Sequence, residues 1–80
     1  MKFKVVVLPG DGIGPEIIAE AVKVMEAVGN RFGHSFNLTY RLVGGVAIEQ
    51  EGEALSKETI KMCKKSDAVL LGAVGHPRYD

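Results

Sequence analysis

Residues 5–18 read VVVLPGDGIGPEII, in which an apolar run is followed by a glycine-rich stretch and then by the start of an amphipathic helix. Gly10, Gly12 and Gly14 stand at alternate positions, and Pro15 occupies a position where a helix can begin. A glycine-rich connection between a strand and a helix either cradles a phosphate group or makes a tight turn with positive φ angles. The glycine spacing and the residues around it distinguish these two possibilities.

The glycine-rich stretch opens an alternation of strands and helices that continues along the chain. Apolar periodicity predicts strands at residues 3–8, 35–43 and 67–75. The predicted helices are one from Pro15 to a stop at Gly29-Asn30, a short piece at residues 46–52 and a longer one that begins after Ser56. The order β-α-β-α-β is typical of an α/β fold with a parallel sheet and right-handed crossovers.

The apolar content of the strands indicates how the sheet is covered. Residues 3–8 are apolar on both faces apart from Lys4, and residues 67–75 form a continuous apolar run after Asp67, which is typical of parallel strands buried on both faces. Residues 35–43 alternate between apolar and polar side chains, so this strand has one wetter face and is expected near a sheet edge. Two amphipathic helices cannot shield both faces of three strands. The sequence therefore predicts the opening of a larger α/β domain that continues past Asp80.

The glycine spacing does not fit the phosphate-binding fingerprints. A Rossmann fingerprint needs G-x-G-x-x-G and an acidic residue at the end of the second strand; here the last glycine comes one residue early, and Tyr40 and Arg41 occupy that strand end. Asp11 would repel a pyrophosphate, Pro15 removes a donor amide, and no Gly-Lys-Ser/Thr follows. We therefore favour a tight turn; the alternative is a loop whose backbone lies against a ligand without gripping phosphate.

Composition limits the class of protein and of partner. The 80 residues include 10 Lys and Arg and 10 Asp and Glu, so no long-range field favours nucleic acid or an anionic membrane. Hydrophobic residues make up 46% and charged residues 25%, as in a soluble globular protein. The lone cysteine, Cys63, and the lack of a signal-peptide core or an apolar span of about 18 residues predict a cytoplasmic protein. The expected partner is a small molecule or another protein.

Three stretches together resemble a known family. VLPGDGIGPEI at residues 7–17, VGGVAI at 43–48 and DAVLLGAVGHPRYD at 67–80 resemble the N-terminal part of the β-decarboxylating dehydrogenases, the isocitrate/isopropylmalate dehydrogenase family. The resemblance covers the whole chain. It implies a dinucleotide-binding fold that is not Rossmann, in which residues 1–80 are the N-terminal part of a single cofactor-side α/β domain.

The resemblance also implies an activity. It implies an NAD-dependent oxidative decarboxylase of a 2-hydroxy acid that uses Mg2+ or Mn2+, with 3-isopropylmalate as the best-matched substrate, and a homodimer as the full-length protein. Isocitrate, homoisocitrate and tartrate are the alternative substrates. An inactive truncated fragment or structural piece is the alternative from another class. The region matched here precedes the family's catalytic tyrosine and lysine, its substrate-binding arginines and its metal-binding aspartates. The resemblance therefore assigns no catalytic or metal-binding residue to this chain.

The resemblance does assign cofactor contacts to this chain. In the family, the loop that matches residues 11–14 lies beside the adenosine of NAD, with the counterpart of Ile13 as an apolar contact to adenine. The segment that begins the loop running along the cofactor toward the nicotinamide matches Gly75, His76, Pro77, Arg78, Tyr79 and Asp80. The family usually has Gly-Gly where this chain has Gly75-His76, and Lys-Trp is common where it has Arg78-Tyr79.

The remaining reactive or titratable side chains are interpreted as structural. His76 is interpreted as a surface-loop histidine, with a functional group that titrates near neutrality as the alternative, and His34 is given no role. Cys63 is interpreted as a small core residue, because no basic cluster surrounds it to stabilise a thiolate. Asp11 and Glu16 flank a helix start, where acidic groups stabilise the helix dipole, and too few oxygen ligands surround them for a metal ion.

Overall fold

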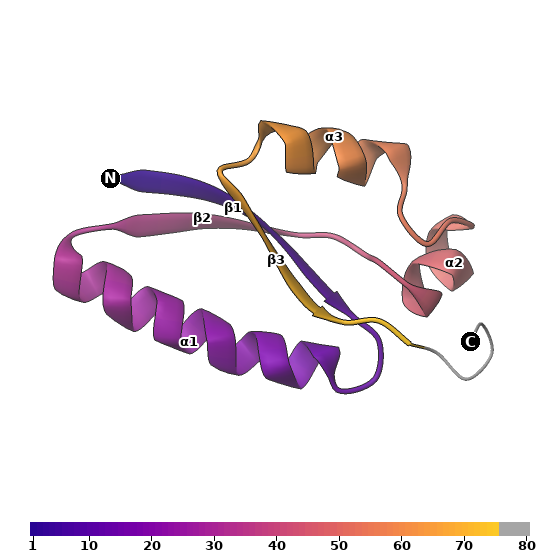
Figure 1. Cartoon of the computed structure of the whole chain (residues 1–80), viewed down its shortest axis with the longest axis horizontal. Coiled ribbons are helices and arrows are strands. Elements are labelled where there is room, and N and C mark those ends of the chain that lie inside the picture. The colour runs from indigo at the N-terminus through magenta and orange to yellow at the C-terminus, as the bar shows by residue number, and fades with distance from the viewer. Residues whose placement is uncertain (76–80) are drawn as a thin grey trace.

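Three parallel strands form one sheet, and helices connect each strand to the next. The computed structural model describes residues 1–75, and its elements are β1 (Lys2–Gly10), α1 (Gly14–Phe32), β2 (Ser35–Tyr40), α2 (Gly45–Glu51), α3 (Lys57–Lys65) and β3 (Ala68–Ala73), shown in Figure 1. The predicted order of three strands and intervening helices is confirmed, and the short helical piece after the Gly44-Gly45 pair is α2.

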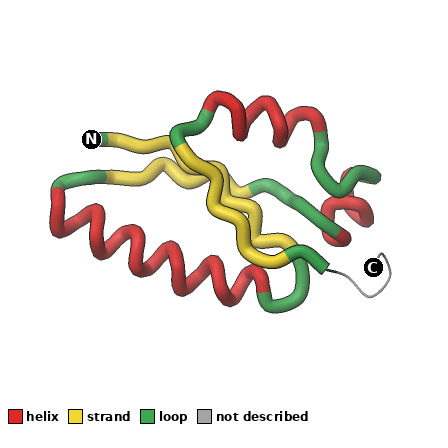
Figure 2. Tube along the Cα trace, viewed as in Figure 1, coloured by secondary structure: helices red, strands yellow, loops and turns green. Residues whose placement is uncertain are grey.

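Strand β1 lies in the centre of the sheet, whose order is β2-β1-β3. Both neighbours run parallel to it: Val5 pairs with Leu38 of β2 and with Ala68 of β3. The edge position of β2 agrees with the prediction from its alternating pattern. Gly10 pairs with Ala73, so the glycine-rich stretch after β1 and the residues after β3 meet at one edge of the sheet (Figure 2).

Helices α1 and α3 cover opposite faces of the sheet, as Figure 1 shows. On the α1 face, Val7 of β1 is completely buried and Ile18 of the helix is 2% exposed. The side chains of Lys4 and Val6 alternate with these apolar residues and face α3. The core consists of Val5, Val7 and Ile18, with Phe3, Val22, Phe36, Leu38 and Leu70 packed against it.

Helix α1 is longer than the sequence predicts. It continues to Phe32 instead of stopping at residues 29–30, and Gly33 ends it in the left-handed conformation with a φ of 74°. Gly29 lies inside the helix, where an added Cβ would come within 2.8 Å of the carbonyl oxygen of His34. This glycine therefore permits the close approach of α1 to the chain entering β2 and does not end the helix.

The strands also differ from prediction at their ends. Strand β1 continues through Pro9 to Gly10, because Gly10 still pairs with β3. Strand β2 stops at Tyr40 instead of Val43: the last contact is the hydrogen bond from the Arg41 amide to β1, after which the chain turns toward α2. Strand β3 occupies Ala68–Ala73, a shorter segment than the predicted residues 67–75.

Part of the apolar surface remains open in this chain. On the α1 face of β3, Leu70 packs against the core, but Val69 and Leu71 on the other face are 46% and 56% exposed. The apolar run at residues 67–75 predicts a strand covered on both faces of a larger domain. Within the described residues, α3 packs on β1 and leaves this face of β3 uncovered. On α1, Val24 is also 65% exposed. The expectation that two helices cannot shield three strands is confirmed.

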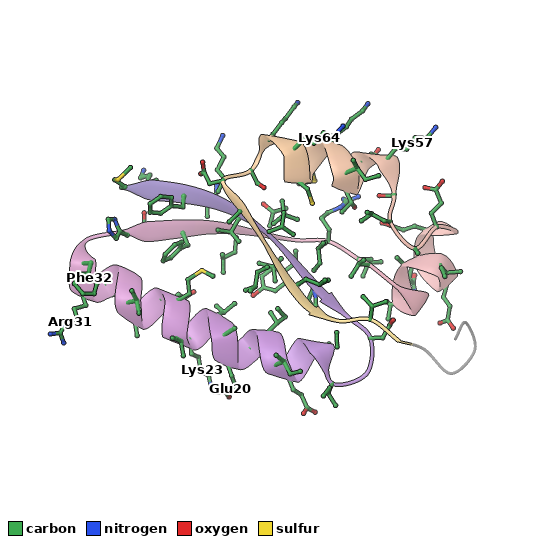
Figure 3. The ribbon with its side chains drawn as sticks, in the orientation of Figure 1. Glu20, Lys23, Arg31, Phe32, Lys57 and Lys64 are labelled. Carbon is green, nitrogen blue, oxygen red and sulfur yellow. The ribbon has the colours of Figure 1, made fainter. Side chains whose placement is uncertain are left out.

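Helix α3 begins with the predicted cap. The Ser56 hydroxyl accepts a hydrogen bond from the Thr59 amide at 3.2 Å. The Thr59 side chain is completely buried, and its hydroxyl oxygen accepts a hydrogen bond from Nε of Arg41 at 3.1 Å. Arg41 also pairs with Glu58 at 3.5 Å, so the strand exit and α3 are joined by polar contacts. Lys57 and Lys64 point away from the sheet, as do Glu20 and Lys23 of α1 (Figure 3).

The variant Ser56→Ala is expected to lower the free energy of unfolding by about 1 kcal/mol, because it removes the acceptor for the Thr59 amide. Denaturant titration of the full-length protein measures the change. Ser35→Ala is the matched control at an exposed strand end, with an expected change within about 0.5 kcal/mol. Equal changes in the two variants would contradict the capping role of Ser56.

Candidate functional site

The glycine-rich stretch forms a tight turn from β1 into α1. Gly10 and Gly12 have φ angles of 80° and 55°, which confirms the favoured interpretation. The Gly14 amide donates to the carbonyl oxygen of Asp11 at 2.8 Å, and the Asp11 amide donates to that of Ala73 at 2.8 Å. Since these two amides already have backbone partners and Pro15 has none to offer, the turn is poorly suited to gripping a pyrophosphate.

Backbone segments of β1, α1 and β3 approach closely at this turn. A Cβ added at Gly10 would overlap the carbonyl oxygen of Ala73, and one added at Gly14 would overlap that of Pro9. A Cβ at Gly72 would overlap the same Pro9 oxygen. The glycine-rich appearance of the sequence here therefore reflects the packing of a strand, a helix and a second strand against one another.

The side chain of Asp11 is buried at the centre of this junction, with 3% of the residue exposed. Its Oδ2 atom accepts hydrogen bonds from the amides of Gly45 at 2.9 Å and Gly75 at 3.1 Å. Its Oδ1 atom accepts one from the amide of Val46 at 2.8 Å. One carboxylate thus joins the glycine turn, the first residues of α2 and the chain two residues beyond β3.

This arrangement corrects the interpretation of Asp11 from the sequence. We expected Asp11 to stabilise the start of α1 together with Glu16, but its carboxylate bonds to the start of α2 instead. Glu16 remains in the first turn of α1, where an acidic side chain is favourable. In the sequence, the trace of this contact is the Gly44-Gly45 pair: Gly44 carries no side chain, and a Cβ there would overlap Oδ2 of Asp11. A single sequence does not reveal that these distant segments meet.

Two of the residues assigned to the cofactor by resemblance are described by the structure. Ile13 precedes the first residue of α1 and is 63% exposed, so its side chain is available to a ligand. Gly75 lies beyond β3, and its amide binds the Asp11 carboxylate in the turn that carries Ile13. Both residues therefore belong to the same edge of the sheet. The other assigned residues lie outside the described part of the chain: His76, Pro77, Arg78, Tyr79 and Asp80.

Within residues 1–75, no three His, Cys, Asp or Glu side chains lie together as a group that could hold a metal ion. Asp11 is also unsuitable as a ligand here, because both of its oxygens face backbone amides. Cys63 is a half-buried free thiol. His34 packs edge-on against Phe3, with ring centroids 5.5 Å apart. No helix in the described residues is both long and apolar enough to cross a membrane.

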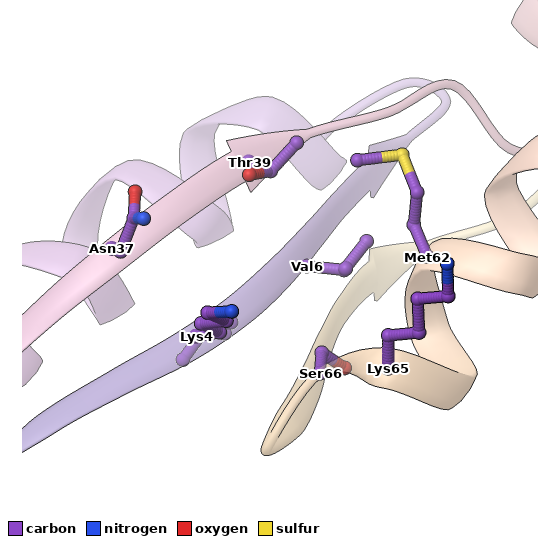
Figure 4. Close-up of a pocket in the computed structure, with 8 residues that line it drawn as sticks. Lys4, Val6, Asn37, Thr39, Met62, Lys65 and Ser66 are labelled. Carbon is purple, nitrogen blue, oxygen red and sulfur yellow. The ribbon is translucent and has the colours of Figure 1, made fainter.

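Among the described residues, three hollows adjoin the sheet. One of about 510 Å3 lies beside the start of β3 and is lined by Phe3, Val5, Met25, Phe36, Asp67, Ala68, Val69 and Leu70. The remaining two lie at different ends of the sheet. One of about 450 Å3 is lined by Pro9, Gly10, Pro15, Ile18, Ala19, Tyr40, Arg41, Leu42 and Val46. The other, of about 200 Å3, lies where Lys4, Val6, Asn37 and Thr39 of the sheet face Met62, Lys65 and Ser66 (Figure 4). Ligands of open α/β sheets bind beyond the carboxyl ends of the strands. The hollow of about 450 Å3 therefore adjoins the candidate site, and the hollow of about 200 Å3 lies away from it.

Comparison with known sequences identifies close relatives of the whole chain. A 3-isopropylmalate dehydrogenase from Dehalococcoides mccartyi is 62% identical over 80 residues, covering 100% of this chain and 22% of that protein. A protein of the same name from Moorella thermoacetica is 62% identical over 78 residues, covering 98% of the chain and 22% of its own length. The chain thus spans about a fifth of the length of these relatives.

Solved structures support the same grouping. The apo β-decarboxylating dehydrogenase from Thermococcus kodakarensis superposes with a TM-score of 0.79 at 38% identity, covering 98% of this chain and 22% of that one. Isocitrate dehydrogenase from Methylococcus capsulatus superposes with a TM-score of 0.82 at 31% identity, with the same coverage of 98% and 22%. The predicted fold type is confirmed. Since the family model described as isocitrate/isopropylmalate dehydrogenase also matches residues 4–80, this chain belongs to the isocitrate/isopropylmalate dehydrogenase family.

Proposed function

We propose that this chain is the N-terminal part of an NAD-dependent 3-isopropylmalate dehydrogenase. The full-length enzyme would convert (2R,3S)-3-isopropylmalate to 4-methyl-2-oxopentanoate and CO2 in leucine biosynthesis. The observation that carries this proposal is the 62% identity, over all 80 residues, to the Dehalococcoides mccartyi protein of that name. The match covers the whole chain and so includes the glycine turn and the exit of β3, which form the candidate site.

In this proposal the chain supplies part of the cofactor site and is assigned no catalytic residue. The turn carries Ile13, which would contact the adenine, and the resemblance assigns residues Gly75 to Asp80 to the part of the site that would hold NAD toward its nicotinamide. When bound, NAD accepts the hydride from C2 of the hydroxy acid. The described residues do not fit a divalent metal site, since no group of three metal-ligating side chains lies among them. The ligands of the Mg2+ or Mn2+ ion are therefore assigned to other parts of the full-length enzyme.

Isocitrate is the second candidate substrate, because the isocitrate dehydrogenase from Methylococcus capsulatus shares the fold with a TM-score of 0.82. Its identity of 31% is half that of the Dehalococcoides mccartyi protein at 62%, which favours 3-isopropylmalate. Homoisocitrate and tartrate remain related alternatives within the enzyme class. We further propose that the full-length enzyme is a homodimer, as the family resemblance implies, and that it is cytoplasmic and has no nucleic-acid or membrane partner. The zero formal net charge of this segment supports the absence of such partners, and its single cysteine supports the cytoplasmic location.

The substrate assignment is tested with the full-length enzyme. Initial rates of NADH or NADPH formation are measured with 3-isopropylmalate, isocitrate, homoisocitrate and tartrate, each with Mg2+, Mn2+ or EDTA. We expect turnover of 3-isopropylmalate with NAD that EDTA abolishes. A preference for isocitrate with NADP would refute the substrate and cofactor assignments together.

The contact between Ile13 and adenine predicts a second result. Ile13→Ala in the full-length enzyme is expected to raise the Kd for NAD about tenfold, because it removes apolar surface worth about 1.4 kcal/mol or more from the contact. The melting temperature should change little, because Ile13 is 63% exposed. Val24→Ala is the matched control, an aliphatic residue 65% exposed on the helix, and should leave the Kd unchanged. Equal Kd values for NAD in the wild type and in Ile13→Ala would show that Ile13 does not contact the cofactor.

A further inference from the structure

Asp11 holds the chain on both sides of the point where β3 ends. Its backbone amide donates to the carbonyl oxygen of Ala73 at 2.8 Å, and its carboxylate accepts from the amide of Gly75 at 3.1 Å. Ala73 is the last residue of β3, so Gly75 lies where the strand pairing with β1 no longer fixes the backbone. A single residue of the glycine turn therefore holds the backbone at both Ala73 and Gly75.

The same carboxylate also fixes the start of α2. The amides of Gly45 and Val46 donate to it at 2.9 Å and 2.8 Å. Gly44 precedes them with a φ of 79°, and a Cβ on this residue would overlap Oδ2 of Asp11. The absence of a side chain at Gly44 thus allows α2 to reach the carboxylate. Among residues 1–75, backbone donors from two distant parts of the sequence, Gly45, Val46 and Gly75, converge on one buried group.

The number of donors limits what can replace Asp11. A carboxylate offers acceptor sites on both oxygens, whereas the amide of Asn has one acceptor oxygen and one donor nitrogen. In either orientation, Asn would place an NH2 group against at least one backbone amide that now donates to Asp11. A buried donor left facing another donor is unfavourable. Asn therefore preserves the size of the side chain while disrupting the junction.

We propose that Asp11 is a positioning residue for the cofactor site, because its carboxylate holds the backbone of Gly75, the first residue of the segment assigned to NAD, against the turn that carries Ile13. This inference rests on the proposed function for the identity of the ligand. Asp11 itself does not touch the cofactor in this account. It acts through the backbone of Gly75. Because the same carboxylate binds the first residues of α2, the position of Gly75 is coupled to the position of that helix.

Amide hydrogen exchange in the full-length protein tests the contact without any cofactor. In the wild type, the Gly75 amide should exchange at least tenfold more slowly than an unbonded amide, and Asp11→Asn should remove that protection. Ile18→Val is the matched control, a buried core change in the same junction that leaves the carboxylate intact. It should lower the melting temperature without selectively exposing Gly75. A wild-type Gly75 amide that exchanges as an unprotected one overturns the proposal, even if Asp11→Asn fails to fold.

Cofactor titration supplies the second readout. The Kd for NAD should rise at least tenfold in Asp11→Asn and stay within twofold of wild type in Ile18→Val, at temperatures where both variants are folded. An Asp11→Asn protein with a lower melting temperature but an unchanged Kd would show that Asp11 is structural only, and would overturn the positioning role. If the wild-type protein does not bind NAD, the proposed function fails, while the exchange of Gly75 still decides whether Asp11 holds the chain.

Discussion

Gly10→Ala is expected to prevent stable folding of the junction between β1 and β3, with a loss of at least about 3 kcal/mol in the free energy of unfolding. Gly10 has a φ of 80°, a conformation that an alanine adopts only at a cost. The added Cβ would also overlap the carbonyl oxygen of Ala73, which accepts the Asp11 amide. The overlap is with backbone, so relief requires β1 and β3 to separate.

Gly33→Ala is the matched control for this prediction. Gly33 has a similar φ of 74°, but a Cβ built there meets no atom within 4 Å. The control therefore carries the backbone strain without the overlap, and it should cost about 1 kcal/mol. Denaturant titration of the full-length wild type and of both variants in that protein measures the difference. Similar losses in the two variants would show that the conformation of Gly10, and not the close approach of β3, accounts for the effect.

Features that depend on neighbouring residues were predictable from the sequence. The strand and helix order follows from apolar periodicity, and the cap of α3 follows from Ser56 and the amide three residues later. The failed Rossmann spacing correctly indicated a turn, because the positive φ angles of Gly10 and Gly12 depend on local backbone geometry. In each case the physical cause lies within a few residues of the signal.

Features that depend on distant residues were not predictable. Gly29 was interpreted as a helix stop, yet it lies inside α1 because the chain entering β2 packs against it. Asp11 was interpreted as an acid at the start of α1, whereas its partners at Gly45 and Gly75 are 34 and 64 residues away in the sequence. The same glycine or aspartate pattern is compatible with either role, and only the fold distinguishes them.

The open apolar surface bears on the behaviour of the 80 residues alone. Large apolar residues on and beyond β3 are exposed: Val69 at 46%, Leu71 at 56% and Val74 at 59%. Strand β3 is also at an edge of the sheet, where unpaired backbone groups can accept another strand. Exposed apolar side chains beside an open edge favour association between copies of the chain.

The isolated 80-residue chain is therefore expected to associate and to show no dehydrogenase activity. Light scattering should detect oligomers, and thermal unfolding should be broad or dependent on concentration. The chain should form no NADH from 3-isopropylmalate above a blank, because its described residues offer no metal cluster and the proposal assigns it no catalytic group. Leu71→Lys places a charge on the open face of β3 and should shift the chain toward monomer. A wild-type monomer with a sharp unfolding transition and measurable NADH formation would show that these 80 residues form an independent enzyme.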